Sequence, residues 1–239
     1  MPTEDLVEVL RLVKDPGEVA RIEAAATIAD ESLAALRSRL GEGATERELG
    51  LELDTEMRRR GASGPSFETI VASGPNGAMP HARPGDRVIA PGDLVVIDFG
   101  AVVDGYCSDM TRTFSIGDPE GERARMLSVV GESQATGVAT VAPAVGCAEV
   151  DAACREVIDE AGWGEAFLHS TGHGVGLDIH EDPRVSSRSE TVLEEGMIVT
   201  VEPGVYLPEL GGVRVEDTVV VTAEGCRALT KAPKEPVVG

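Results

Sequence analysis

The chain has 239 residues, of which 42% are hydrophobic and 26% are charged, as in a globular protein with a hydrophobic core rather than a disordered one. Its 42 acidic residues outnumber its 21 basic ones, and the resulting net charge of −21 repels nucleic acid and anionic membranes. We therefore expect no nucleic acid and no membrane as a partner.

The N-terminus and the cysteines both bear on cellular location. The first ten residues, MPTEDLVEVL, lack the basic region and the long apolar run of a signal peptide, and no later apolar segment is long enough to span a bilayer. The four cysteines show no CxxC spacing and are interpreted as free, buried thiols in a reducing compartment: Cys107, Cys147, Cys154 and Cys226. The predicted location is the cytoplasm.

The first third of the chain predicts two helices and a strand. Residues 15–40 place apolar side chains near a 3.6-residue period, and the helix ends at the glycine that follows. Residues 45–61 open with a capping box, Thr45 with Glu48, and also stop at a glycine. A strand and then a loop rich in glycine and proline are expected within residues 67–89.

Residues 93–114 predict a β-hairpin around an Asp-Gly turn at 104–105. With two residues in the turn, Asp98 lies opposite Thr111, so Asp98 and Asp109 share a sheet face as diagonal neighbours. A three-residue loop would reverse that parity. Because the flanking residues are largely apolar, the two carboxylates would repel each other, and a positive group is expected beside them. The alternative is a pair of aspartates on a surface hairpin.

The rest of the chain repeats this order of elements. Helices are expected at about 118–139 and 148–161, and a second pair of strands at 196–206 and 211–221. This order resembles a loosely duplicated α+β unit, since helices followed by a hairpin are succeeded by further helices and a strand pair. Since no linker divides the chain, residues 1–239 are expected to form one domain.

The second strand pair also carries two carboxylates. Glu202 and Glu216 each follow β-branched residues that indicate burial, and Arg214 points to the same sheet face as Glu216. A buried glutamate alone is more often the structural partner of an arginine. Two carboxylate pairs in one chain, together with clustered histidines, favour a shared site instead.

Three of the four histidines lie within the twelve residues 169–180, which is closer than scattered structural histidines would lie. Two carboxylate pairs and one histidine form a ligand set of hard oxygens and one nitrogen, without a thiolate. Such a set favours manganese, cobalt, iron or zinc, bound as a pair rather than as one structural zinc ion. A metal pair is a known device for activating water.

Four segments resemble, in chain order, the motifs of the pita-bread metallopeptidases: VIDFGAVVDGYCSDMTRTF, TGHGVGLDIHEDP, TVEPGVY and GGVRVEDTVVV. This family contains methionine aminopeptidases, Xaa-Pro aminopeptidases, prolidases and creatinase, and the resemblance covers roughly residues 10–232. The segment NGAMPHARP around His81 is similar to the proline-specific branch. The implied fold class is α+β, the pita-bread fold, in which two pseudo-related halves of helices pack on a curved antiparallel sheet.

The resemblance also implies a role for each site residue. The implied metal ligands are Asp98, Asp109, His173, Glu202 and Glu216. The implied catalytic residues are Glu202 as the general base, His180 at the scissile carbonyl and His81 near the leaving nitrogen. The implied substrate-binding residues are His81, His169, His180 and Arg214.

The activity that the resemblance implies is hydrolysis of the bond after the N-terminal residue of a peptide substrate, with Xaa-Pro bonds favoured. The implied cofactors are two divalent metal ions, manganese or cobalt ahead of zinc or iron, which activate the attacking hydroxide. A methionine aminopeptidase is the alternative enzyme, and a non-catalytic module that binds peptides or proteins is the alternative outside enzymes. Proline-specific members usually carry a creatinase-type N-terminal domain, which helps to form dimers in the family. Here the catalytic domain alone is expected, and a homodimer is a possible partner state.

Overall fold

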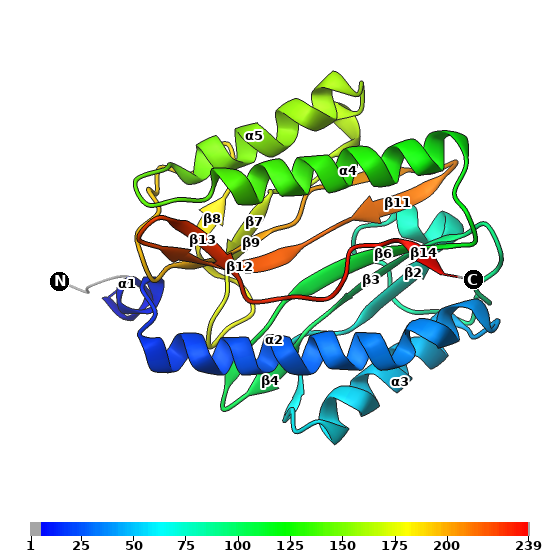
Figure 1. Ribbon diagram of the computed structural model, residues 1–239, viewed down its shortest axis with the longest axis horizontal. Helices are drawn as coiled ribbons and strands as arrows, with labels where there is room; N and C mark the ends of the chain where they lie inside the picture. The colour runs from blue at the N-terminus through cyan, green and yellow to red at the C-terminus, as the bar shows by residue number, and fades with distance from the viewer. Residues whose placement is uncertain (1–5, 239) are drawn as a thin grey trace.

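The computed structural model describes residues 6–238, in which two pairs of helices flank a layer of strands (Figure 1). Helices α2 and α3 lie along one side of the strands, and α4 and α5 lie along the other. The helices are α1 (Leu6–Leu12), α2 (Pro16–Leu36), α3 (Glu46–Arg59), α4 (Gly121–Thr140) and α5 (Cys147–Glu160). Within residues 6–238, no helix is long and apolar enough to cross a membrane.

The strands beside α2 and α3 form two sheets. The first has the order β14-β6-β3-β2 and contains β2 (Ile70–Ser73), β3 (Leu94–Phe99), β6 (Met110–Ile116) and β14 (Val237–Val238). The second has the order β1-β4-β5 and contains β1 (Gly64–Pro65), β4 (Ala101–Val103) and β5 (Tyr106–Cys107). Strand β14 runs parallel to β6, which departs from the antiparallel pairing that the fold class predicts.

The strands beside α4 and α5 form the other two sheets. The order β13-β12-β9-β7-β8 contains β7 (Gly172–Gly174), β8 (Glu181–Val185), β9 (Ile198–Val201), β12 (Asp217–Thr222) and β13 (Gly225–Ala228). A separate antiparallel pair contains β10 (Gly204–Leu207) and β11 (Gly211–Arg214). Short 3₁₀ turns complete the structure: η1 (Arg37–Gly41), η2 (Gly74–Ala78) and η3 (Gly164–Ala166).

Each half has its own hydrophobic core under its helix pair. Side chains of α2 and α3 pack on β3 and β6 through residues that include Leu33, Leu53, Val95 and Phe114. Side chains of α4 and α5 pack on β9 and β12 through residues that include Val130, Ile158, Val199 and Val219. The cysteines are free thiols, as the sequence predicted, and three of the four are buried. The two cores support the predicted duplication of an α+β unit.

Helices α2 and α3 both begin with a capping box. The Asp15 carboxylate accepts a hydrogen bond from the Glu18 backbone N–H at 2.8 Å, and the Glu18 carboxylate accepts one from the Asp15 N–H at 2.8 Å. Thr45 and Glu48 form the same arrangement, which confirms the prediction for α3. The α-helical part of the first segment ends at Leu36 rather than at residue 40, because the last turn tightens into η1.

The first hairpin has the predicted register. Asp98 pairs with Thr111, and the turn residues Asp104 and Gly105 have φ angles of 49° and 86°. The hairpin is interrupted at Gly100, where a Cβ atom would lie 1.8 Å from the Ser108 backbone oxygen. This close crossing separates β3 from β4 and leaves Asp109 just before β6.

The second strand pair is a correction. The sequence predicted two continuous strands, but both break near their glutamates, so that β9 pairs with β12 and β10 pairs with β11. Pro203 has no N–H to donate to a ladder. The N–H of Glu202 donates to Thr171 O at 2.8 Å, directly before β7. The N–H of Glu216 likewise donates to Thr111 O at 3.1 Å, which ties the two halves together.

Two leucines of α3 offer a matched test of the first core. Leu53 is 1% exposed and belongs to that core, whereas Leu51 is 61% exposed. We expect Leu53→Ala to lower the free energy of unfolding by about 2–5 kcal/mol, because it leaves a cavity, and Leu51→Ala to lower it by about 0.5 kcal/mol or less. Urea unfolding measures both values, and equal losses would contradict this packing.

Candidate metal centre

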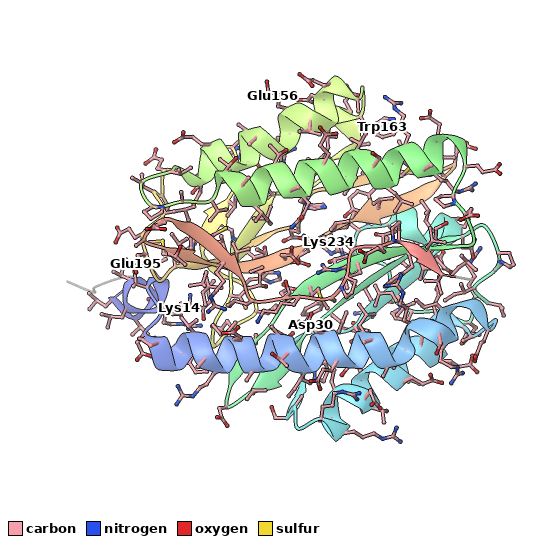
Figure 2. All side chains as sticks on the ribbon, in the orientation of Figure 1. Lys14, Asp30, Glu156, Trp163, Glu195 and Lys234 are labelled. Atoms are coloured by element: carbon pink, nitrogen blue, oxygen red, sulfur yellow. The ribbon has the colours of Figure 1, made fainter. Side chains whose placement is uncertain are left out.

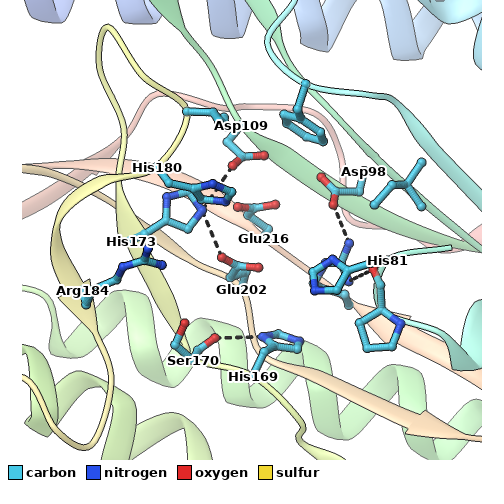
Figure 3. Close-up of a pocket in the computed structure, with 15 residues that line it drawn as sticks. His81, Asp98, Asp109, His169, Ser170, His173, His180, Arg184, Glu202 and Glu216 are labelled. Carbon is cyan, nitrogen blue, oxygen red and sulfur yellow. Dashed lines mark hydrogen bonds and ion pairs between the residues drawn. The ribbon is translucent and has the colours of Figure 1, made fainter. Parts of the chain in front are cut away.

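A cavity of about 370 Å³ lies between the two halves, and the nine site residues that the sequence predicted all line it (Figure 3). They are His81, Asp98, Asp109, His169, His173, His180, Glu202, Arg214 and Glu216. The structure thus brings the predicted residues together from both halves of the chain, while their chemical roles stay predictions.

The carboxylates reach the cavity from the places where strands begin, end or break. Asp98 lies near the end of β3, and Asp109 lies just before β6. Glu202 follows β9, and Glu216 precedes β12. His173 lies in the middle of β7. The interrupted ladders therefore turn these side chains toward a common space (Figure 3).

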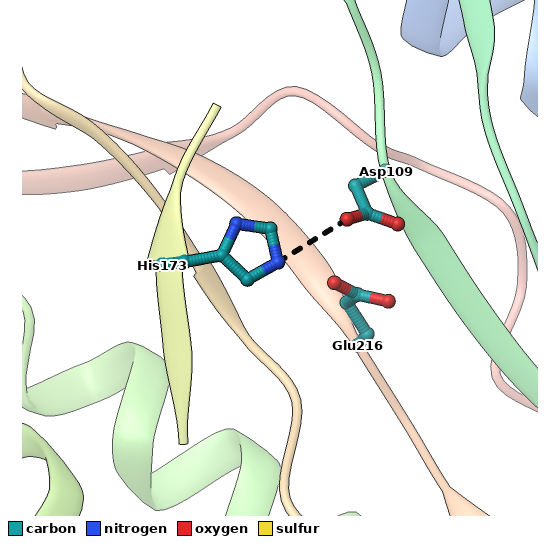
Figure 4. A group of neighbouring side chains, drawn as sticks. All are labelled: Asp109, His173 and Glu216. Atoms are coloured by element: carbon teal, nitrogen blue, oxygen red, sulfur yellow. Dashed lines mark ion pairs between the residues drawn. The ribbon is translucent and has the colours of Figure 1, made fainter. Parts of the chain in front are cut away.

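His173 is buried and supplies a neutral imidazole. Its Nδ1 lies 2.9 Å from the backbone oxygen of Gly174, so Nδ1 carries the proton and donates it. The lone pair of Nε2 therefore faces Asp109 Oδ2 and Glu202 Oε1, each at 3.4 Å (Figure 4 shows the contact with Asp109). Burial lowers the pKa of His173 to about 4, so this ring does not balance the charge of the carboxylates near neutral pH.

The carboxyl groups around His173 are unfavourable as anions. Burial raises the pKa of Glu202 to about 8, and the negative charge of Asp98 also acts in that direction. Burial and the neighbouring carboxylates raise the pKa of both Asp109 and Glu216 well above their ordinary values. Without a cation among them, these groups must hold protons at a pH where ordinary carboxyl groups have lost them.

Arg214 is the positive group that the first hairpin predicted, and it connects Asp98 to His169. Its guanidinium lies 2.5 Å from Asp98 Oδ2 and donates to the Tyr206 hydroxyl at 2.7 Å. That hydroxyl donates in turn to His169 Nε2 at 2.8 Å, and His169 Nδ1 donates to Ser170 O at 2.8 Å. Burial, with the charge of Arg214, lowers the pKa of His169 to about 4. His169 is therefore a neutral ring in a fixed orientation.

Two threonines orient the glutamates, and sequence reasoning missed both. Thr111 Oγ1 donates to Glu216 Oε2 at 2.7 Å and accepts from Arg214 Nε at 3.1 Å. Thr200 Oγ1 donates to Glu202 Oε1 at 3.2 Å. The sequence did place both threonines near the site. Thr200 precedes Glu202 by two residues, so the two side chains share a sheet face, and Thr111 was expected opposite Asp98.

Other residues of the cavity also escaped the sequence analysis. An apolar wall is formed by Phe67, Ile70, Pro80 and Ile179. An exposed cation, Arg184, lies beside His173 at the edge of the cavity (Figure 3). These residues come from loops and from two short strands, β2 and β8, where no periodic pattern predicts which way a side chain points.

The comparison with known families agrees with this geometry. Residues 20–223 match metallopeptidase family M24 over most of the chain. The chain belongs to this family. As a member of family M24, it is expected to hold divalent metal ions at the clustered carboxylates and His173.

Relatives and solved structures of the family are similar over almost the whole chain. An Xaa-Pro dipeptidase from Pyrococcus furiosus is 45% identical over 232 residues, which cover 97% of this chain and 67% of that relative. The structure of an Xaa-Pro dipeptidase from Bacillus anthracis is 47% identical, covers 100% of this chain and 67% of its own, and has a TM-score of 0.97. An X-Pro aminopeptidase structure from Thermotoga maritima is 41% identical, with 99% and 67% covered and a TM-score of 0.95.

This chain thus spans about two thirds of the length of these relatives. The structural matches confirm the predicted fold class, α+β with the pita-bread arrangement. They also confirm the recognition of the family from its motifs.

The donor atoms fit the divalent ions that the family implies. Asp109, His173 and Glu216 each offer one ligand atom, and these atoms all lie within 4.8 Å of one another. Among residues 6–238, Asp98 Oδ1 and Glu216 Oε1 are buried oxygens without a hydrogen-bond partner. Cations would satisfy these oxygens, accept the Nε2 lone pair of His173 and neutralise the carboxylates together. Hard oxygens with one imidazole suit manganese, cobalt, iron or zinc.

The metal-free protein should lose stability as the pH rises above neutrality. A carboxyl group whose pKa is raised by folding keeps a proton that the unfolded chain has released, so its contribution to stability is lost as the pH approaches the folded pKa. The folded pKa of Glu202 is about 8, against an ordinary value of 4.5. We expect the free energy of unfolding to fall by about 2 kcal/mol between pH 6.5 and pH 8.

Urea unfolding of chelator-treated protein at the two pH values measures this loss. Glu202→Gln should reduce it, while Glu209→Gln, which alters an exposed glutamate outside the cavity, should keep the wild-type difference. His169 and His173 have lowered pKa values of about 4, so they lower stability only below about pH 6.5, outside this window. Equal stability of the wild type at both pH values would contradict the prediction.

Proposed function

We propose that this chain is a metal-dependent peptidase that cleaves the bond between an N-terminal residue and a following proline. The observation that supports this most strongly is that four carboxylates, a neutral imidazole and an apolar wall share one cavity. Relatives named Xaa-Pro dipeptidase and X-Pro aminopeptidase point to the same class of substrate. The proposal includes two divalent ions, with manganese or cobalt preferred.

The proposed ligands are Asp98, Asp109, His173, Glu202 and Glu216. Divalent ions bound there would polarise the scissile carbonyl and lower the pKa of a bound water. Four carboxylates carry the negative charge that two such ions neutralise, which accounts for the acidity of a largely buried site. Thr111 and Thr200 would hold Glu216 and Glu202 in place for binding.

Glu202 is the proposed general base. The hydroxyl of Thr200 occupies its Oε1, which leaves Oε2 to take a proton from the attacking water and deliver it to the leaving nitrogen. A prolyl nitrogen carries no hydrogen within the peptide bond, so it leaves as a secondary amine only after such a delivery. His81, which lines the same cavity, is proposed to lie near that nitrogen.

His180 is proposed to contact the scissile carbonyl oxygen. Its ring meets the ring of His173 edge to face, with 4.4 Å between the centroids, which places an imidazole over the centre. Burial lowers the pKa of His180, so the neutral ring has one N–H to donate toward a developing oxyanion. Phe67, Ile70 and Pro80 form a wall of the size and polarity that a proline ring requires.

Three peptides test the proposed function: an Xaa-Pro dipeptide, a longer peptide that begins Xaa-Pro, and a peptide that begins Met-Ala. We expect the metal-loaded protein to cleave one or both Xaa-Pro peptides, with loss of activity on chelation and recovery when manganese or cobalt is restored. Glu202→Gln should lower kcat by about a hundredfold or more. Glu209→Gln is the matched control. Cleavage of the Met-Ala peptide alone would favour the alternative, a methionine aminopeptidase, and would refute the proline assignment.

Arg184 favours dipeptides within this substrate class. It is exposed at the edge of the cavity, opposite His173 in the β7–β8 ladder, and among residues 6–238 its guanidinium forms no ion pair. The carboxylate of an Xaa-Pro dipeptide ends one residue beyond the scissile bond, within the same cavity. An unoccupied guanidinium there would bind that carboxylate through charge-assisted hydrogen bonds.

Arg184→Met should therefore raise KM for an Xaa-Pro dipeptide by about tenfold or more, because hydrogen bonds to a charged group contribute about 1.5–3 kcal/mol. KM for the same dipeptide with an amidated C-terminus should change little. Arg59→Met removes the same charge from an exposed position on α3 and is the control. An equal rise in KM for the acid and the amide would contradict a carboxylate site at Arg184.

A further inference from the structure

The loop between His173 and His180 is folded around one buried carboxylate, that of Glu181. The Glu181 side chain is 6% exposed, although it follows the exposed His180 directly in sequence. Its Oε1 accepts a hydrogen bond from the backbone N–H of Asp178 at 3.1 Å. The N–H of Gly176 in turn donates to Asp178 O at 3.1 Å, so this carboxylate organises the turn that returns the chain to the cavity.

Both oxygens of Glu181 are bound by cations from the beginning of the chain. Arg11 of α1 donates to Oε1 through Nη2 and, at 3.1 Å, through Nε. Lys14, which is labelled in Figure 2, donates to Oε2 at 3.2 Å, and its side chain is 2% exposed. The backbone N–H of Lys14 donates to Gly196 O at 3.0 Å, which anchors this segment just before β9. We call Arg11, Lys14 and Glu181 the N-terminal clamp.

His180 has little else to hold it. Among residues 6–238, its ring makes no hydrogen bond, and its described ring contact is the edge-to-face packing on His173. Behind it lies a second cavity of about 210 Å³, lined by residues that include Arg11, Glu181 and Arg184 as well as His180. Because there is space on both sides of the ring, its position depends on the backbone that Glu181 fixes.

Core packing explains little of the attachment of α1, because Leu12, which is partly buried, is the one side chain among residues 6–12 that packs against the second core. None of the residues of α1 is buried, and its apolar side chains are largely exposed. The ion pairs of Arg11 with the loop therefore add a specific attachment of α1 to the limited apolar contact of Leu12. The pair of Lys14 with Glu181 is buried, so it is costly to desolvate and is better explained by the geometry that it imposes than by stability.

We propose that Arg11 and Lys14 are positioning residues that act through Glu181 to hold His180 over the metal centre. The inference rests on the proposed function, in which His180 contacts the scissile carbonyl. Loss of the clamp releases the loop and removes a contact that strengthens in the transition state, so kcat falls while KM and metal binding stay unchanged.

Arg11→Met tests the clamp in the metal-loaded chain, with Arg21→Met as the matched control, because Arg21 is a half-exposed arginine of α2 that does not touch the loop. We expect kcat for the best Xaa-Pro peptide to fall about tenfold in Arg11→Met, with KM within about twofold of the wild type and equal metal content. Arg11→Lys should recover most of the loss, since it restores a cation beside Glu181. Amide hydrogen exchange in peptides covering residues 174–181 should be faster in Arg11→Met and unchanged in Arg21→Met.

Glu181→Gln keeps the volume of the side chain and serves as a second variant. It should lower kcat as Arg11→Met does, and adding Arg11→Met to it should have no further effect, because the clamp is already broken. A kcat of Arg11→Met within about twofold of the control, or full additivity of the two changes, would overturn the inference. If the wild type cleaves no Xaa-Pro peptide, the proposed function fails. The clamp is then tested by amide hydrogen exchange alone, and unchanged exchange of residues 174–181 in Arg11→Met would overturn the inference.

Discussion

The mutual repulsion of buried carboxylates is the constraint on which the rest of this structure depends. Asp109, Glu202 and Glu216 surround a neutral imidazole, and burial, together with the charges of neighbouring carboxylates, raises the pKa of each of these carboxyl groups. Arg214 lines the same cavity, but its guanidinium is paired with Asp98. Without added protons or metal ions such a site is unfavourable at neutral pH, and divalent ions would also satisfy its unpaired oxygens.

The fold imposes this arrangement by interrupting its strands. Continuous ladders would direct the backbone groups of Glu202 and Glu216 to neighbouring strands within one half. Glu202 keeps such a partner, because its N–H donates to Thr171 beside β7, but Glu216 donates its N–H to Thr111 of the other half. Each half packs around its own core, and a third cluster that includes Ile22, Ile198 and Val220 joins the halves. The breaks bring acids from both halves to one cavity. The metal centre is thus part of the interface that joins the halves.

Local rules predicted much of this from the sequence. The Asp-Gly turn set the register of Asp98 against Thr111, and the capping box at Thr45 set the start of α3, because both depend on residues close in sequence. The break of the second strand pair was not predicted, since it depends on partners in the other half. Tyr206 and the clamp residue Arg11 were missed for the same reason, because their partners His169 and Glu181 lie far away in the chain.

Melting temperatures at pH 8.5 test most directly whether cations hold these carboxylates together. The measurement compares the wild type and the double variant Asp109→Asn/Glu216→Gln, each with and without manganese. We predict that manganese raises the melting temperature of the wild type only, and that the metal-free double variant melts above the metal-free wild type because two repelling charges are gone. A wild type unaffected by manganese, and no more stable after removal of the charges, would contradict the account.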